Sequence, residues 1–396
     1  MKFSVLLPTR NRLEYLKYAI TSVLQQDYQN WEIVISDNDS EQDIKSYISS
    51  LADPRILYFR TSAFIPVTDN WNNAMKKSSG DYIIMLGDDD CLAKGYFRTT
   101  LKLLQQHNHP DMIYTGALLF LYPGVLSEIP QGHLHRWGNA AFLEGKKEPF
   151  LLDKSKSLLA VKAVMSFKNE FYYNIQFSLF SRDFIKKMQR YGDFFQSPYP
   201  DFYATTASLL KADRILAVPY PLVAVGITPK SYGFYYLNNK ENEGIKFLNN
   251  FSDNAVYKNV KKYLLPGTDM NSSWLLAMET VKKNFEKEYE LHVDYQQYRL
   301  LQILDHHHKF VTKKGIQIKD LWNMSKQLLW REKIIYQIPL SLISLCLRSL
   351  PKNRVNHWCT QFMQSFHPQF TTTKIDGNFN NILEAVEHIH LANDAK

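Results

Sequence analysis

Residues 80–90 read GDYIIMLGDDD, a short apolar run followed by three consecutive aspartates. The run at 82–86 predicts a buried strand, and Asp88, Asp89 and Asp90 stand at its carboxyl end. Three adjacent anions repel one another, so we expect a positive partner there, and a divalent cation that bridges phosphate groups is the obvious candidate. For the triplet in isolation, a solvated acidic turn is the alternative. The residues upstream distinguish the two interpretations.

Predicted strands and helices alternate upstream of the triplet. The strands are predicted at 3–7, 31–36 and 56–59, and the helices at 13–26, from about residue 43, and at 70–77. This alternation is typical of an α/β protein with a parallel sheet. In open sheets of this kind, ligands bind outside the carboxyl ends of the strands. Residues 8–12, 37–40 and 88–90 occupy those ends, so we expect the polar chemistry of this half at one edge.

The side chains expected at this edge suit a nucleotide. Arg10 and Arg12 can face phosphates, and Asp37 can accept hydrogen bonds from a nucleobase. The aspartate triplet can hold a metal ion between phosphate oxygens. Each residue also has an ordinary interpretation, because Asp37 can simply shape a turn and either arginine can be a solvated surface residue. The combination of the three features is more specific than any one of them.

Three ordered blocks resemble the family 2 glycosyltransferases of the GT-A fold: SVLLPTRNR at 4–12, VISDN at 34–38, and SGDYI at 79–83 before the acidic triplet. The resemblance covers roughly residues 1–233 and includes features of a bacterial subgroup. It implies a nucleotide-sugar donor, a divalent cation (Mn²⁺ or Mg²⁺) held by the acidic motif, and usually an inverting displacement at the anomeric carbon.

The resemblance also implies roles for particular residues. Those matched to nucleotide-sugar binding are Pro8, Thr9, Arg10, Arg12, Asp37, Asn38, Asn70, Asp88 and Asp89, and those matched to the metal are Asp89 and Asp90. Gly87 stands where the commoner family pattern has an aspartate, so the principal metal ligand is either Asp89 or Asp90. Ser36 and Asp39 are further departures, which leave Asp37 as the position matched to the base-contacting carboxylate.

An inverting transfer also needs a carboxylate that removes a proton from the acceptor hydroxyl. The segment SPYPDFY at 197–203 is the best place for it, because Pro200 fixes the backbone and Asp201 can begin a helix. The subgroup resemblance includes this segment, together with 177–182 and 226–233. We therefore predict Asp201 as the catalytic base, with a helix cap as its structural alternative. Glu170 and Asp193, in aromatic surroundings that can raise a carboxyl pKa, are the next candidates.

Two further segments are expected near the site. The loop at 226–233 is bounded by glycines and can close over the diphosphate, or it can be an ordinary surface loop. The segment 122–149 is rich in glycine and proline and is expected to be irregular and to face the acceptor. Six aromatic side chains are candidates for stacking on sugars or for packing: His133, His135, Trp137, Phe171, Tyr172 and Tyr173.

The length of 396 residues and a 45% hydrophobic content predict two to three folded domains. We expect a GT-A domain at 1–235, divided into a nucleotide-sugar-binding half at 1–95 and an acceptor half at 96–235, then a helical region at 236–330 and a basic amphipathic segment and tail at 331–396. The three cysteines show no paired spacing, which favours a reducing cytoplasm and argues against disulfides or a zinc site. The triplet His306, His307 and His308 is expected at the surface.

Residues 326–354 hold six Lys or Arg and one acid, so much of the formal net charge of +8 lies there. The apolar core at 334–350 is shorter than the roughly 20 residues that a membrane-spanning helix needs. It can lie on the anionic inner face of a membrane, or pack on the catalytic domain or another subunit. The basic residues show no nucleic-acid-binding motif, so nucleic acid is not an expected partner.

The sequence therefore predicts a metal-dependent glycosyltransferase that moves a sugar, with inversion, from a nucleotide-diphosphate donor to a glycan or lipid-linked acceptor in cell-surface polysaccharide synthesis. Two alternatives stay open. A nucleotidyltransferase has the same need for a nucleotide and a metal but attacks the α-phosphorus, and a nucleotide-sugar-binding module has no turnover. The expected location is the cytoplasm, either in solution or on the inner face of the membrane.

Overall fold

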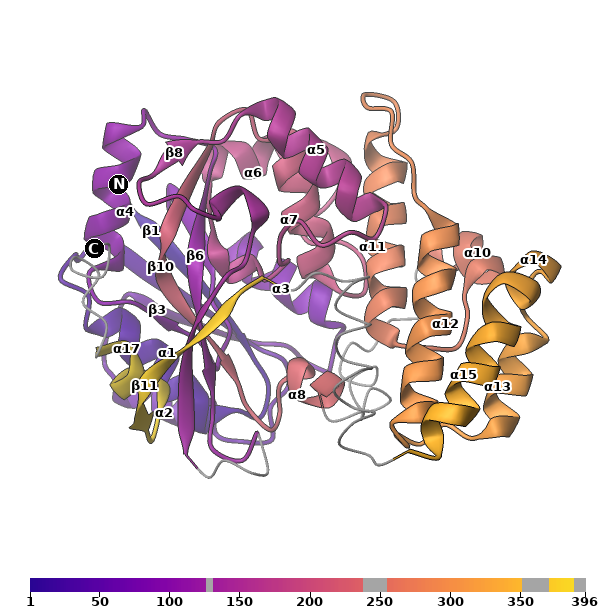
Figure 1. The fold of residues 1–396 in the computed structure, drawn as a ribbon. Helices are drawn as coiled ribbons and strands as arrows, with labels where there is room; N and C mark the ends of the chain where they lie inside the picture. Colours follow the sequence, from indigo (N-terminus) through magenta and orange to yellow (C-terminus); the bar gives the residue numbers. More distant parts are fainter. Residues whose placement is uncertain (126–130, 238–254, 351–369, 388–396) are drawn as a thin grey trace.

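The computed structural model describes residues 1–125, 131–237, 255–350 and 370–387. These residues form a mixed sheet of 11 strands with helices on both faces, and a block of helices beside it (Figure 1). The expected α/β class with a mainly helical C-terminal region is confirmed.

The first half follows the predicted alternation. Its elements are β1 (Phe3–Thr9), α1 (Leu13–Leu24), β2 (Trp31–Asp37), α2 (Ile44–Ser50), β3 (Ile56–Arg60), α3 (Val67–Lys77) and β4 (Tyr82–Met85). The four strands are parallel, in the order β4-β1-β2-β3. The chain therefore reverses its direction of winding at β1, which places a crevice at the carboxyl ends of β1 and β4.

Burial on both faces explains the nearly continuous apolar runs of these strands. In β1, Phe3, Val5 and Leu7 enter the core that packs under α1 and α4. Leu6 faces the opposite way, into the large core shared with α7 and the C-terminal helices. Successive residues of a strand point to opposite faces, so the two cores share one sheet.

The second half makes the sheet mixed rather than parallel. Its elements are β5 (Cys91–Leu92), α4 (Tyr96–Gln106), β6 (Met112–Leu121), β7 (Gly132–Trp137), β8 (Phe150–Leu151), α5 (Lys154–Met165), β9 (Ser178–Ser181), α6 (Arg182–Met188), α7 (Pro200–Lys211), β10 (Ile215–Ile227) and α8 (Tyr232–Leu237). Strand β9 lies antiparallel between β4 and β6, and β10 runs parallel to β6. The expectation of an irregular segment at 122–149 is wrong for residues 132–137, which form β7.

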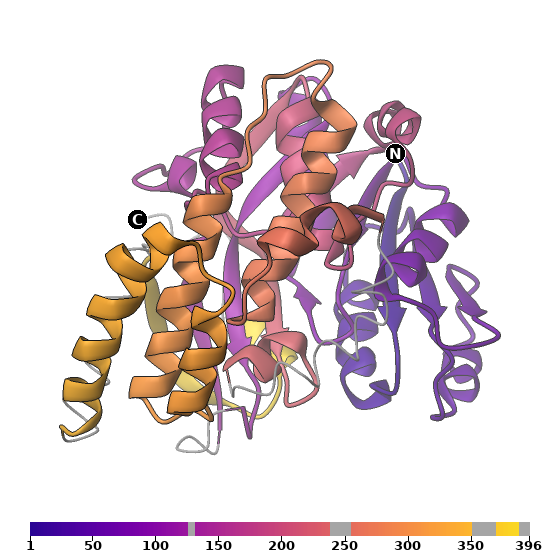
Figure 2. The ribbon, with the colours of Figure 1, turned by 90° about the vertical axis from the view of Figure 1, so that its right-hand side faces the viewer.

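The C-terminal helices pack against the sheet domain through the contact of α11 with α7. They are α10 (Ala255–Val260), α11 (Asp269–Phe285), α12 (Tyr295–Val311), α13 (Ile318–Ser325), α14 (Trp330–Glu332) and α15 (Ile338–Arg348), with a π-helical turn at Lys333–Gln337 before α15. Figure 2 shows these helices as a layer lying across one side of the sheet domain. Residues 238–254 of the predicted helical region at 236–330 fall outside the described residues. No helix within the described ranges is long and apolar enough to cross a membrane.

The chain returns to the sheet at its C-terminal end, which the sequence analysis did not foresee. Strand β11 (Thr372–Phe379) pairs antiparallel with β7, and α17 (Ile382–Glu387) buries Ile382, Ala385 and Val386 beside it. Most side chains of β11 are exposed, so the strand carries no alternation of apolar and polar residues to signal it. The segment predicted as one tail at 331–396 thus divides between the helical block and the sheet.

The expectation that the three histidines lie at the surface is also wrong. His306 and His307 are buried, and His308 is half-buried. Their helix, α12, is covered on one side by α11 and on the other by α13 and α15, so successive side chains at 100° intervals meet different neighbours. The two described cysteines, Cys91 and Cys346, are free thiols, in agreement with the expected lack of disulfides for this part of the chain.

Candidate active site

A cavity of about 900 Å³ opens at the carboxyl ends of β1 and β4 and extends to α11 and α12. It has the size of a typical ligand pocket. Ten of the predicted site residues line it: Pro8, Thr9, Arg10, Arg12, Asn38, Asn70, Asp88, Asp89, Asp90 and Asp201. Asp37 does not line it. Residues distant in the sequence are thus brought to one cavity, as the strand-end argument predicts.

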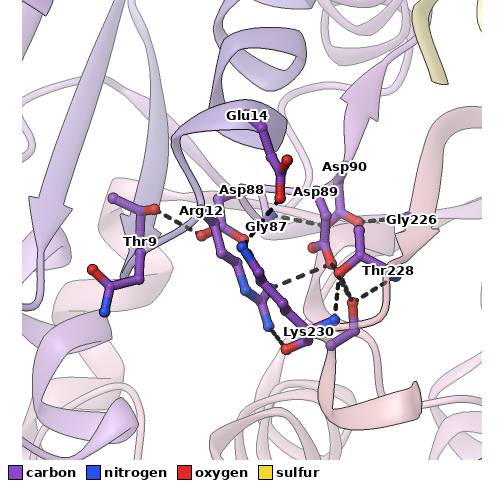
Figure 3. A network of polar contacts seen from close by, with 12 residues as sticks. Thr9, Arg12, Glu14, Gly87, Asp88, Asp89, Asp90, Gly226, Thr228 and Lys230 are labelled. Atoms are coloured by element: carbon purple, nitrogen blue, oxygen red, sulfur yellow. Dashed lines mark hydrogen bonds and ion pairs between the residues drawn. The ribbon is translucent and has the colours of Figure 1, made fainter. Parts of the chain in front are cut away.

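Asp88 is tied to the first strand-end loop. Its carboxylate accepts a hydrogen bond from the Thr9 hydroxyl at 2.7 Å and one from Arg12 Nη1 at 3.0 Å (Figure 3). Burial raises the pKa of Asp88 to about 6, with a further rise from Asp89, while Arg12 and Thr9 oppose the shift. Both oxygens of Asp88 are therefore already partnered within the protein.

Asp89 is held through only one of its two carboxylate oxygens. Its Oδ2 lies 3.3 Å from Arg12 Nη1 and accepts hydrogen bonds from the hydroxyls of Ser231 and Thr228. Its Oδ1 accepts no hydrogen bond from the described residues, and the side chain keeps 10% exposure. Asp89 is therefore the member of the triplet with an oxygen that a ligand in the cavity can still use.

The Asp90 side chain links two segments of the backbone, and we call this link the clamp. Its Oδ1 accepts a hydrogen bond from the Gly226 amide and its Oδ2 one from the Gly87 amide, each at 2.8 Å. Burial, followed by the charge of Asp89, raises the pKa of Asp90 well above its usual value. The clamp explains Gly87, because a Cβ there would lie 2.4 Å from Asp90 Oδ2. A side chain at residue 87 would therefore force the Asp90 carboxylate to shift, and glycine leaves its two backbone hydrogen bonds in place.

Arg12 is the positive partner that the triplet requires within the protein. Burial opposes its charge, but Asp88 and Asp89 outweigh this effect and raise the pKa of Arg12. Its Nη2 also donates to the carbonyl oxygen of Lys230. Arg12 thereby links the triplet to the loop at 228–231, whose Ser231 contacts Asp89 (Figure 3).

The loop at 226–233 lies over the acidic triplet. Besides the contacts of Arg12 and Ser231, the Lys230 ammonium pairs with Glu14 at 3.1 Å. Thr228 and Ser231 are hydrogen-bonded to each other within the loop. The structure therefore places these side chains beside the predicted phosphate site, whereas their contact with a diphosphate stays a prediction.

Amide and carboxylate contacts fix the residues at the side of the cavity where the nucleotide is predicted to bind. Asn38 brackets the backbone of Ile65 through two hydrogen bonds of 2.9 Å, and Asn70 holds Ser36. Asp37 is fully buried, and its carboxylate accepts from the Ser40 amide and the Tyr58 hydroxyl. It shapes the turn after β2, the ordinary interpretation given above, and its contact with a base stays a prediction.

Arg10 takes another position at the same edge. Its guanidinium lies 3.7 Å from the centroid of the Phe64 ring. This cation–π contact holds the side chain at the cavity wall, where its charge is available to a phosphate.

Asp201 is a buried carboxyl group in the cavity wall. It lies in the first turn of α7, after Pro200, but the helix cap is Tyr199. Among the described residues, its carboxylate accepts one hydrogen bond, from the Ile175 amide at 3.2 Å, and forms no ion pair. Burial raises its pKa to about 7, because the Ile175 hydrogen bond offsets only part of the desolvation. The group is thus poised to exchange a proton near neutral pH.

The two other candidate bases lie elsewhere. Neither Glu170 nor Asp193 lines the cavity. The Asp193 side chain is 51% exposed and pairs with Lys76 at 2.9 Å. An exposed carboxylate paired with a lysine lacks the desolvation that raises the pKa of Asp201.

Aromatic side chains form the wall that continues from Asp201. The lining includes Trp137, Tyr172, Tyr173, Tyr199, Phe202 and Trp274. Trp137 and Tyr172 lie with ring centroids 4.7 Å apart, and Tyr173 and Phe202 at 4.2 Å. Among the aromatic residues predicted to meet sugars, Trp137, Tyr172 and Tyr173 line the cavity, whereas His133, His135 and Phe171 do not.

The sequence analysis missed the contribution of the C-terminal helices. Asn271 and Trp274 of α11, and Asp305, His308 and Lys309 of α12, also line the cavity. The sequence shows polar and aromatic residues within helical patterns here. Such a pattern does not indicate whether a helix packs on the core or lines a cavity. Among the described residues, no group of three or more His, Cys, Asp or Glu is arranged to hold a metal ion. A cation here would need ligands from a bound phosphate as well.

Comparison with known proteins identifies the class. Residues 4–124 match the sequence model of the family described as "Glycosyl transferase family 2". Residues 4–124 are therefore a family 2 glycosyltransferase segment, and the resemblance seen in the three motif blocks is confirmed.

Curated bacterial relatives carry glycosyltransferase names. One from Campylobacter jejuni, named GalNAc(5)-diNAcBac-PP-undecaprenol beta-1,3-glucosyltransferase, is 35% identical over 44% of this chain and 57% of its own length. WfgD from Escherichia coli, named UDP-Glc:alpha-D-GlcNAc-diphosphoundecaprenol beta-1,3-glucosyltransferase, is 27% identical over 26% of this chain and 42% of its own length. The matched segments thus span about half of these relatives.

Solved structures show weaker likeness. TarS of S. aureus in complex with UDP-GlcNAc has a TM-score of 0.42 and 15% identity, over 80% of this chain and 93% of its own. The mannosyltransferase PcManGT from Pyrobaculum calidifontis, solved with GDP-Man and Mn²⁺, has a TM-score of 0.42 and 13% identity, over 92% and 84%. No conclusion about this chain rests on these similarities.

Proposed function

We propose that this protein transfers a sugar from a nucleotide-diphosphate donor to a hydroxyl group of a lipid-linked glycan, with inversion, in the synthesis of a bacterial surface polysaccharide. The observation that carries the proposal is Asp201, a buried carboxyl group with a pKa of about 7, in the same cavity as the acidic triplet and two arginines. The family match and the names of the relatives support the class of reaction.

The donor lies at the carboxyl ends of β1 and β4. Arg10 and Arg12 compensate the charge of its diphosphate, and the loop at 228–231 covers it. Asn38 and Asp37 are placed at the turn where a base would lie. The name of the Escherichia coli relative contains UDP-Glc, and we propose a nucleoside diphosphate sugar of this kind here.

The residues present fit a divalent cation that is shared with the donor. Mg²⁺ and similar ions often bind through one or two carboxylates together with substrate phosphates and water. Asp89 offers the free oxygen, so we propose it rather than Asp90 as the principal ligand, because both oxygens of Asp90 accept backbone hydrogen bonds. A bound cation supplies charge neutralisation for the departing diphosphate.

Asp201 removes the proton of the acceptor hydroxyl. The acceptor oxygen then bonds to the anomeric carbon of the donor, and the bond between that carbon and the phosphate oxygen breaks. Desolvation keeps the Asp201 carboxylate basic enough for this task, and the aromatic wall orients the acceptor sugars by stacking. The nucleoside diphosphate leaves on the side where Arg10 and Arg12 stand.

The experiment compares Asp201→Asn with the matched control Asp193→Asn, which removes an exposed carboxylate outside the cavity. Both variants are incubated with a panel of nucleotide sugars, Mn²⁺ or Mg²⁺, and a lipid-linked acceptor, and the release of nucleoside diphosphate and of pyrophosphate is measured. We expect the Asp201 variant to lose at least about 100-fold in rate and the control to keep the wild-type rate.

Other outcomes identify the alternatives. Release of pyrophosphate by the wild type supports a nucleotidyltransferase. Failure of the wild type to turn over any donor, with donor binding intact, supports a binding module. Equal rates for the Asp201 variant and the wild type would refute the role of Asp201.

A further inference from the structure

Helix α15 leaves most of its apolar side chains exposed to solvent, although Leu340 and Leu347 pack half-buried on the core of the helical block. Its one fully buried residue is Ser344, whose hydroxyl lies 3.0 Å from His307 Nδ1. Gln337, just before the helix, is buried and contacts His307 Nε2 at 3.1 Å. Leu342 and Ile343 are 63% and 53% exposed on the same helix. A helix on a water-soluble protein usually buries most of its apolar side chains, so this degree of exposure is unusual.

The exposed apolar residues are concentrated in this part of the molecule. Of thirteen large hydrophobic side chains that are exposed in the described part of the chain, eleven lie between Ile318 and Leu350. We call these eleven side chains of α13, α14, the π-helical turn and α15 the apolar face. Trp322 and Trp330 are each 67% exposed within it. Helices α13 to α15 lie at the edge of the molecule farthest from the sheet (Figure 1), so the sheet domain does not cover this face.

Cations outnumber anions beside the apolar face. Lys319, Lys326 and Arg331 are exposed, and Lys333 is half-buried. The acids of the segment are engaged elsewhere, because Glu332 is buried against Arg299 at 2.6 Å and Asp320 accepts from the Gln317 amide at the start of α13. The surface therefore combines aliphatic side chains, tryptophan and uncompensated cations.

We propose that the apolar face lies in the interface of a membrane containing anionic lipids. Tryptophan with flanking Lys and Arg around aliphatic side chains is the composition of helices that lie in the plane of a bilayer surface. A second copy of the chain fits less well, since a symmetric dimer through this face would bring its cations together. Anionic lipid headgroups compensate the same cations.

The position of the surface also suits the active site. On α12, Asp305, His308 and Lys309 line the cavity, whereas His307 of the same helix holds α15. One helix thus separates the acceptor end of the cavity from the apolar face. This arrangement lets a lipid-linked acceptor stay in the membrane while its glycan enters the cavity. This last step rests on the proposed function.

The test is flotation of the full chain with vesicles. Wild-type protein is mixed with phosphatidylcholine vesicles alone or with about a third phosphatidylglycerol, at low and at high salt. The double variant Leu342→Glu/Ile343→Glu is compared with Leu151→Glu/Leu159→Glu, a matched control at two exposed leucines of the sheet domain. We expect at least about a tenfold loss of vesicle binding for the first and none for the control.

A charge variant separates the electrostatic contribution to vesicle binding from the apolar contribution. Lys326→Glu/Arg331→Glu is expected to lose binding to anionic vesicles by about fivefold for each cation removed, with little change on neutral vesicles. Nucleotide binding, followed by thermal shift, should be the same in all variants, so a failure of the membrane proposal is distinguishable from a failure of the proposed activity.

Three results would overturn the proposal: no flotation of the wild type, equal flotation of the Leu342/Ile343 variant, or an equal loss in the control. If sedimentation shows that the wild type is a dimer and the Leu342/Ile343 variant a monomer, the occupant of this face is a second copy and not a lipid surface.

Discussion

Replacing Asp201 by asparagine is expected to stabilise the fold while it abolishes transfer. Burial raises the Asp201 pKa from 3.8 to about 7. The folded state therefore binds this proton more tightly than the unfolded chain does. The carboxyl group stabilises the fold fully below its unfolded pKa, and that contribution is lost as the pH rises through about 7.

The size of the effect follows from the pKa difference. About three pKa units correspond to roughly 4 kcal/mol of unfolding free energy at about pH 8, relative to acidic solution. Asparagine has nearly the same shape and does not ionise, so it avoids this cost. We expect the Asp201→Asn variant to unfold at a temperature several degrees above that of the wild type near pH 8, with a smaller difference near pH 5.

Thermal unfolding of both proteins across this pH range provides the measurement, with Asp193→Asn as the control. Because Asp193 is exposed and paired with Lys76, its variant should show no gain that grows with pH. An Asp201→Asn variant whose advantage is constant or shrinks with rising pH would refute the claim that desolvation tunes this group.

Other substitutions test the remaining parts of the site and fold. Gly87→Ala should destabilise the protein by about 1–3 kcal/mol and weaken nucleotide binding, since its Cβ would meet Asp90 Oδ2 at 2.4 Å, whereas Gly233→Ala, with its nearest neighbour at 3.6 Å, should be tolerated in both assays. Arg12→Met should speed amide hydrogen exchange at 228–231, because Arg12 donates to Lys230, while Arg10→Met should not; equal exchange in both variants would count against the link. Glu32, whose burial is outweighed by hydrogen bonds from Lys2, Ser4 and Ser79, has a pKa lowered to about 2, so its stabilisation holds above about pH 4.5 and is lost as the pH falls toward 2. Glu32→Gln should therefore cost roughly 1–2 kcal/mol in denaturant melts at neutral pH and progressively less in acid, and a cost that does not depend on pH would contradict this assignment.

The first half of the fold was predictable because its signals are local. Buried parallel strands give continuous apolar runs, and each is followed by polar residues that must lie at the same sheet edge. Arg12, Asp88 and Asp89 all follow such strands, and in the structure Arg12 contacts both carboxylates. The predicted strand at 82–86 and the observed β4 differ by one residue.

The rest depended on long-range packing that local patterns do not encode. Asp201 meets the cavity because α7 packs on α5 and α11, and Trp274 enters it because α11 lies across the same helix. Strand β11 pairs with a strand more than 230 residues earlier and has mostly exposed side chains, so neither periodicity nor composition signals it. The burial of His306 and His307 likewise follows from the helices that cover α12.

The most direct test of the account is the dependence of nucleotide binding on a cation and on Asp89. Thermal unfolding is followed with a nucleoside diphosphate, Mn²⁺ or a chelator, in the wild type and in Asp89→Asn. The account predicts stabilisation of roughly 2.7 kcal/mol when the nucleotide is at about 100 times its dissociation constant with Mn²⁺. That stabilisation should be lost with the chelator or in the variant. Equal stabilisation of the wild type with and without the cation, and of the Asp89 variant, would contradict the assignment of the acidic triplet.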